Sequence, residues 1–184
     1  MTRYVPPSPP LIRARWHGGA QTPRLIVMHS TVSPCRPGQA RATARYFAST
    51  ETKASAHYCV DPAEVIQCVG DHVVAYHCGY NSDSIGVELC EYPSWDRTRW
   101  DDEPHRQMEI RAARLVAELC LAYGIRPYFV GRLGLVLGRR GVTTHRAMSL
   151  AYRRSDHWDP GAWRRRRFMR RVRAQIARIK KETR

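Results

Sequence analysis

Two histidines that follow short apolar runs are the residues best placed to do chemistry in this sequence. His29 ends a four-residue apolar run, which is too short for a helix but long enough for a buried strand. His145 ends a similar run, Val142-Thr-Thr-His145, and Ser155-Asp-His-Trp-Asp-Pro-Gly161 follows with two aspartates and another histidine. A single histidine at such a position is more often a structural residue of the core. Two imidazoles and a carboxylate from separate strand ends, however, form a typical hydrolytic zinc site with the fourth position open for water.

Further motifs accompany these residues in a fixed order along the chain. They are His29, Ser55-Ala-His-Tyr58, Tyr76-His-Cys-Gly79, Ser84-Ile-Gly-Val-Glu-Leu89, His145 and Asp159-Pro-Gly161. In this order they resemble the zinc-dependent N-acetylmuramoyl-L-alanine amidases of the type 2 family, which includes phage endolysins, cytoplasmic recycling amidases and peptidoglycan recognition proteins. The resemblance covers about Leu25 to Gly161 and implies a bound Zn²⁺ as cofactor and bacterial peptidoglycan as substrate.

The resemblance assigns the three zinc ligands to His29, His145 and Asp159, because the family carries an Asp or a Cys directly before Pro-Gly. The spacing alone leaves His157 or Asp156 possible in place of Asp159. Asp159 could also simply cap the helix that is expected to follow it, a role that aspartate often fills.

The resemblance and the local sequence together indicate two catalytic residues. Glu88 is the predicted general base, since it lies on the motif strand, shares a face with Gly86, and would be costly to bury between apolar neighbours without a role. A surface glutamate on an edge strand is the alternative. His157 stands where relatives have a Lys or His that stabilises the developing oxyanion, and an imidazolium can do the same. The predicted substrate-binding residues, each of which could instead support the core, are His57, His77 and Asn81.

Several features depart from the family pattern. The acid that often follows the second histidine is absent from Thr144-His-Arg-Ala147, and Ala56 replaces a tyrosine that some relatives use, which leaves the base chemistry to Glu88. The segment Met148–Arg154 is long and is expected to bulge outward as a loop. The Gly- and Arg-rich segment Gly131–Arg140 has no counterpart that can be assigned.

Periodicity predicts the elements that position these residues. They are a helix from Gln39 to about Thr50, a hairpin of 56–60 and 65–69, a strand at Ser84–Leu89, a long helix from Pro104 to Gly124, and a short strand into His145. This order predicts a single α/β domain, residues 23–184, with a central mixed β-sheet flanked by helices. Residues 1–22 are expected to form a proline-rich N-terminal arm.

Composition limits the class of protein. The length of 184 residues suits one domain with a core of its own, and six cysteines without CxxC spacing suggest reduced, mostly buried thiols. No run approaches the roughly 18 apolar residues of a membrane span, and the N-terminal segment Met1–Pro10 lacks an apolar signal core. We therefore expect a protein that is cytoplasmic as synthesised and acts on the cell wall after the membrane is opened.

Positive charge is concentrated at the C-terminus. The net charge is +15, and from Arg153 onward 13 basic residues face three acidic ones. A basic helix is predicted at about 162–181, with an apolar stripe formed by Phe168, Val172, Ile176 and Ile179. This stripe should dock on the sheet and leave a basic face outward. The face could bind anionic wall polymers or a lipid surface, or remain solvated; no motif for specific nucleic-acid binding accompanies it.

Taken together, the sequence predicts a monomeric zinc amidase that cuts between N-acetylmuramic acid and L-alanine, as the catalytic domain of a phage endolysin. A cytoplasmic amidase that recycles soluble muropeptides is an alternative, against which the basic tail argues. A peptidoglycan-binding module without hydrolysis is another, but such modules usually lack a zinc ligand and here all three candidates are present.

Overall fold

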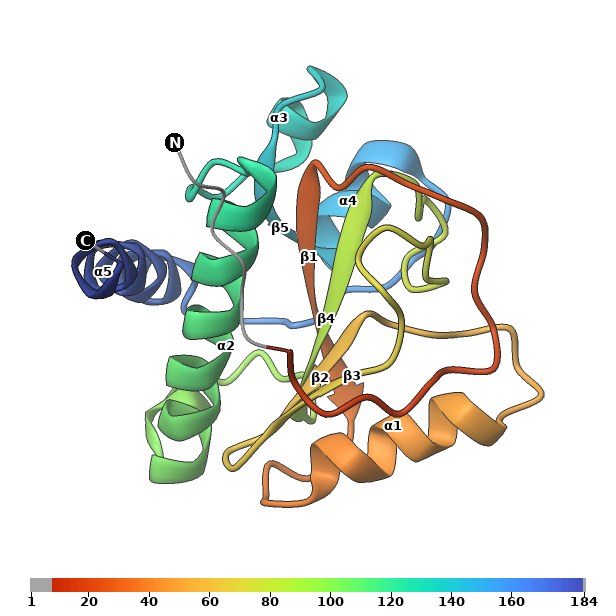
Figure 1. Ribbon diagram of the computed structural model, residues 1–184, viewed down its shortest axis with the longest axis horizontal. Coiled ribbons are helices and arrows are strands. Elements are labelled where there is room, and N and C mark those ends of the chain that lie inside the picture. The colour runs from red at the N-terminus through yellow and green to blue at the C-terminus, as the bar shows by residue number, and fades with distance from the viewer. Residues whose placement is uncertain (1–7, 184) are drawn as a thin grey trace.

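A five-stranded mixed sheet forms the centre of the computed structural model, which describes residues 8–183 (Figure 1). The strands lie in the order β3-β2-β4-β1-β5, and their bounds are β1 Leu25–Val32, β2 Tyr58–Val60, β3 Val65–Gln67, β4 Ser84–Glu91 and β5 Gly141–Thr144. β2, β4, β1 and β5 are parallel, and only β3 runs antiparallel. The predicted single α/β domain with a mixed sheet is therefore confirmed. β1 and β4 extend beyond the predicted ends, while the two hairpin strands are shorter than predicted.

The two faces of the sheet belong to different apolar clusters. Ile26 and Met28 of β1 share one cluster with the buried side of α2 (Glu103–Tyr123). Leu25 and Val27 point to the opposite face, where they join a cluster that includes α4 (His145–Tyr152) and α3 (Arg132–Val136). Because side chains alternate along a strand, His29 lies on this second face. The remaining helices are α1 Gln39–Ser49, the 3₁₀ helix η1 Arg97–Asp101 and α5 Arg165–Glu182.

The ends of α2 follow from local chemistry. Asp102 precedes the helix, and its side chain accepts a hydrogen bond from the backbone of His105, with Pro104 in the first turn. At the other end Gly124 takes the left-handed conformation, with φ 63°, that stops a helix. The predicted helix from Pro104 to Gly124 is thus confirmed, as is the helix predicted at Gln39 to about Thr50.

The C-terminal helix packs on another helix and not on the sheet. Phe168, Val172 and Ile179 are buried as the apolar stripe predicts, but α5 lies against α2, which separates it from the sheet (Figure 1). The predicted docking on the sheet is wrong because α2 already covers that face. Arg171 and Arg167 of α5 hold this arrangement by ion pairs of 2.7 and 2.8 Å with the buried Glu109 of α2.

Two further predictions are corrected. The segment Met148–Arg154, expected to be a loop, is mostly the helix α4, because Thr144 caps it by accepting a hydrogen bond from the backbone of Ala147. Residues 8–22 are extended but are not an arm outside the domain. Their backbone bonds to Gln67 and Cys68 of the hairpin region and to Val74, and Gln21 reaches the backbone oxygen of Ser84. Residues 1–7 of the predicted arm lie outside the described residues.

The cysteines are unpaired, and five of the six are buried, in agreement with the prediction of reduced thiols. Among the residues described, no helix is both long and apolar enough to cross a membrane.

Candidate metal and catalytic site

Three side chains from separate elements converge beside the carboxyl end of β5, where this strand meets the middle of β1. Met28 and Thr144 are register partners in the parallel pair, so the residues that follow them, His29 and His145, lie side by side. Their Nδ1 atoms are 3.1 Å apart. Asp159, from the loop before α5, places its carboxylate oxygens 3.0 Å from Nδ1 of His145 and 3.4 Å from Nδ1 of His29.

These separations suit a zinc ion. Zinc bonds of about 2.0–2.1 Å in a tetrahedron require ligand atoms about 3.3–3.4 Å apart, close to the three distances observed. All three side chains are buried, and they form the one group of possible ligands found among residues 8–183. Asp159 therefore fits as third ligand better than Asp156, which is exposed. It does not cap α5, which has no side-chain cap.

A chain of hydrogen bonds fixes the protonation of His29. Ser84 Oγ donates to the backbone oxygen of Asn81 (2.9 Å), so it accepts from Nε2 of His77 (3.1 Å). Nδ1 of His77 then carries no proton and accepts from Nε2 of His29 (3.0 Å). His29 is thereby left with an unprotonated Nδ1 directed at the other candidate ligands. Such a partner on the far ring nitrogen is typical of histidines that bind metals.

His145 has an equivalent support. Its Nε2 lies 3.2 Å from Oγ of Ser155, and this hydroxyl is 2.7 Å from Oγ of Ser149 in α4. A proton on Nε2 donated to Ser155 leaves Nδ1 free for a metal. Neither serine was predicted from the sequence. Nothing in the spacing identifies Ser149, although Ser155 opens the acidic segment that contains Asp159.

Burial and pairing give these ligands the charges that a metal requires. Burial alone would raise the pKa of Asp159, but the adjacent imidazoles of His145 and His29 hold it far below its usual range. Burial lowers the pKa of His29, although Asp159 opposes the change. It also drives the pKa of His77 well below its usual value. His29 thus presents a neutral imidazole and Asp159 an ionised carboxylate, the states that bind zinc.

Close packing explains the glycine of the strand motif. A Cβ atom on Gly86 would lie 2.6 Å from Cγ of His77, so only glycine lets this ring rest on β4. Asn81 holds the backbone on which His77 lies, because its Oδ1 accepts hydrogen bonds from the backbone nitrogens of His77 (2.9 Å) and Cys78 (2.8 Å). His77 and Asn81 were predicted to bind substrate. The structure shows them as supports of the site, and a direct substrate contact stays a prediction.

His57, also predicted to bind substrate, is fully buried and cannot do so in this structure. Its Nδ1 accepts from the backbone nitrogen of Gly86 (3.0 Å), and its Nε2 faces the backbone oxygen of Val73 (2.9 Å). Burial lowers the pKa of His57 to about 4, so the ring is neutral. The prediction is corrected: His57 ties the neighbouring segments to β4.

Glu88 lies beside the three candidate ligands. It is the register partner of His29, so both side chains are on the same face of the sheet. β4 is the central strand, which excludes the alternative of an edge-strand glutamate. Burial, and secondarily the charge of Asp159, raise the pKa of Glu88 to about 8. Within the described part of the chain its carboxyl group has no hydrogen-bond partner, so it is available to a bound molecule.

His157 lies at the exposed rim of the same site. Its ring stacks on that of His145, with centroids 4.4 Å apart, and its Nδ1 is 3.8 Å from Oδ1 of Asp159. It is thus near enough to meet a substrate bound at the metal position, whereas its exposure makes it a poorer ligand candidate than Asp159. Its predicted action on the oxyanion stays a prediction.

Comparison with known proteins agrees with this geometry. Residues 19–162 match the family described as N-acetylmuramoyl-L-alanine amidase. A probable N-acetylmuramoyl-L-alanine amidase of Bacillus licheniformis is 34% identical over 117 residues, which are 54% of this chain and 30% of that protein. The amidase XlyA of Bacillus subtilis (strain 168) is 34% identical over 84 residues, 43% of this chain and 28% of that protein. The matched region thus spans about a third of these relatives' length.

Solved structures show the same fold. The crystal structure of the Staphylococcus aureus hydrolase AmiA, in complex with its ligand, superposes with a TM-score of 0.73 at 18% identity. The match covers 94% of this chain and 84% of that one. Because the family match spans most of the sequence and includes all three candidate ligands, the chain belongs to the N-acetylmuramoyl-L-alanine amidase family.

Proposed function

We propose that the protein is a zinc-dependent peptidoglycan amidase that hydrolyses the bond between the lactyl group of N-acetylmuramic acid and L-alanine. The observation that carries this proposal is the convergence of His29, His145 and Asp159 beside an unbonded Glu88, in a chain of the amidase family. A non-catalytic binding module would not need a half-buried, unpaired carboxyl group next to a complete set of candidate ligands.

The residues of the site divide the chemistry among them. His29, His145 and Asp159 would hold the zinc, which when bound supplies a Lewis acid that acidifies water and polarises a carbonyl. Glu88 takes the proton from the attacking water and passes it to the departing alanine nitrogen. His157 donates a hydrogen bond to the oxyanion as it forms.

The substrate in this proposal is the intact wall, as for an endolysin, and the protein acts on it once the membrane has been opened. Hydrolysis of a small soluble muropeptide would require only the metal site and no additional binding surface. The surface next to that site instead carries many exposed arginines, which suit an extended anionic partner.

Purified sacculi test the proposal. The protein should contain about one zinc per chain, since the ligands form one site, and should release new alanine amino groups. Its Glu88→Gln variant should keep the zinc and release almost none. New reducing sugar ends, which would place the cut in the glycan, would overturn the assignment as an amidase.

A further inference from the structure

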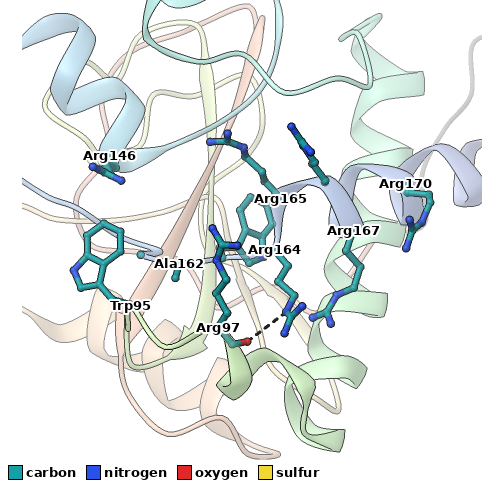
Figure 2. Close-up of a pocket in the computed structure, with 11 residues that line it drawn as sticks. Trp95, Arg97, Arg146, Ala162, Arg164, Arg165, Arg167 and Arg170 are labelled. Atoms are coloured by element: carbon teal, nitrogen blue, oxygen red, sulfur yellow. Dashed lines mark hydrogen bonds between the residues drawn. The ribbon is translucent and has the colours of Figure 1, made fainter.

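A groove of about 770 Å³, drawn in Figure 2, has Arg146, the residue directly after His145, in its lining. Its walls are the first turns of α5, the η1 region and the segment that leads into α5. No acidic residue lines it. Its seven arginines are Arg97, Arg146, Arg164, Arg165, Arg166, Arg167 and Arg170.

Most of this charge is not neutralised within the protein. Asp101 pairs with Arg164 and Arg167, and Arg167 also reaches Glu109. Among the described residues, no carboxylate lies within 4 Å of the other five guanidinium groups. Arg165 and Arg166 lie in the first turn of α5, which contains no acid and where the helix dipole disfavours cations. This arrangement weakens the folded state, and an anion bound in the groove would offset the repulsion.

The groove leads to the metal site. Arg146 directly follows His145, and its guanidinium lies 4.8 Å from the ring centre of Trp95. Trp95 stacks on Trp158, the residue before Asp159, with ring centres 5.2 Å apart. Trp95 and Arg146 lie at one end of the drawn site and Arg170 at the other (Figure 2). A long ligand in the groove would therefore end next to the position of the scissile bond.

The lining indicates the chemistry of that ligand. Guanidinium groups bind phosphate oxygens in a bidentate manner and keep their charge at any relevant pH. Arg166 and Arg170 are four residues apart on α5, so their Cα atoms are separated by about 6 Å along the helix. This spacing suits a polymer that carries one phosphate in each short repeating unit. Trp95, which lines the groove and is about half exposed, offers apolar contact to the carbon atoms of sugars or polyols.

We propose that this arginine groove binds a linear phosphodiester polymer that is attached to the cell wall, and so holds the wall while peptidoglycan occupies the metal site. A groove suits a chain better than a flat lipid surface. The choice of a wall polymer over a nucleic acid rests on the proposed function, because the groove is lined by Arg146, the residue directly after His145 of the site where peptidoglycan would be cut.

The test compares two triple variants with the same loss of charge. Arg97, Arg166 and Arg170 are changed to Gln in the groove variant; Arg13, Arg45 and Arg140, which are exposed elsewhere, are changed to Gln in the control. Binding to purified poly(glycerol phosphate) is titrated at several salt concentrations. Sedimentation with walls before and after chemical removal of the polymer is the second assay, and thermal unfolding checks that both variants are folded.

Parent and control should bind the polymer equally, and the groove variant should bind more weakly. Each lost contact to a single chain lowers the slope of log K against log salt by about 0.7, so the slope should fall by about 2 and affinity by roughly 30-fold at 0.2 M salt. Stripped walls should not distinguish the proteins. If the groove variant unfolds more easily, the double variant Arg166→Gln/Arg170→Gln replaces it, with a loss of roughly 10-fold.

Equal binding of the polymer by all three proteins would overturn the proposal. Tighter groove-dependent binding of a single-stranded oligonucleotide with the same number of phosphates, or of anionic vesicles, would also overturn it in favour of that ligand. Neither assay needs hydrolysis. Walls that are bound through the groove but release no alanine would therefore refute the amidase function and leave the groove proposal intact.

Discussion

Gly86→Ala should impair metal binding although it touches no metal ligand. The added Cβ would lie 2.6 Å from Cγ and 2.8 Å from Cδ2 of His77. Ordinary contacts of this kind are about 3.5 Å or longer, so the ring must retreat by roughly 1 Å. The ring cannot do so freely, because it is bonded on one side to Ser84 (3.1 Å) and on the other to His29 (3.0 Å).

The size of the effect follows from this geometry. A retreat of roughly 1 Å lengthens the bond between His29 and His77 to about 4 Å, beyond the range of a hydrogen bond. His29 would then lose the partner that holds its Nδ1 unprotonated, and such losses typically weaken metal affinity 10- to 100-fold. The free energy of unfolding of the metal-free protein should fall by about 1–3 kcal/mol, because the extra methyl group overfills a packed site.

Zinc affinity, measured by competition with a chromophoric chelator, and urea unfolding of the metal-free protein separate these two effects. Gly70→Ala is the matched control, since a Cβ atom there meets nothing within 4 Å. Adding His77→Ala to Gly86→Ala removes the clash, so stability should partly recover while zinc affinity stays low. Zinc affinity in Gly86→Ala equal to that of the parent would refute the idea that His77 orients His29.

Three other predictions concern single groups. Glu88→Gln should keep zinc and lower turnover by about 10²-fold or more, as measured on sacculi; activity within a few-fold of the parent would point to another base. His157→Ala should retain zinc by elemental analysis and lose rate, whereas loss of the metal would make this residue a ligand. Burial opposes protonation of His105, but Cys35 and Glu91 help raise its pKa to about 10. Stability from this group is therefore complete below about pH 6.5 and lost as pH rises through about 10, by at most about 1.4 kcal/mol per pH unit. Urea unfolding should show this decline in the parent, and a decline of equal size in His105→Gln would contradict it.

Much of the sheet could be predicted because its strands obey simple rules. β1 is a short apolar run between turn residues, and β4 carries an alternating motif with a glycine. Parallel pairing then brings His29, Glu88 and His145 together, since Glu88 is the register partner of His29 and His145 follows Thr144, the partner of Met28. The predicted ligand set rests on this property and on the resemblance to the family.

The packing of α5 could not be predicted, because an apolar stripe on a helix does not indicate which element covers it. The apolar stripe of α5 indicates that this face is buried, but either the sheet or α2 could bury the same side chains. The buried Glu109 of α2 requires cations, and Arg167 and Arg171 provide them. α4 was missed for a different reason: the comparison with relatives suggested a loop, although Thr144 and the apolar spacing of Ala147, Met148 and Ala151 favour a helix.

His57 and His77 show most clearly which contacts the sequence could not predict. His57 and His77 occur in motifs, and a polar residue in a motif is easily interpreted as a substrate contact. In the structure both side chains contact the backbone of β4 at Gly86, and only this glycine could have indicated that contact from the sequence. A glycine inside a buried strand costs stability unless something approaches the backbone closely. Here His77 lies directly on it and His57 bonds its amide, so the glycine of the motif marks the place where the candidate ligand His29 is held in position.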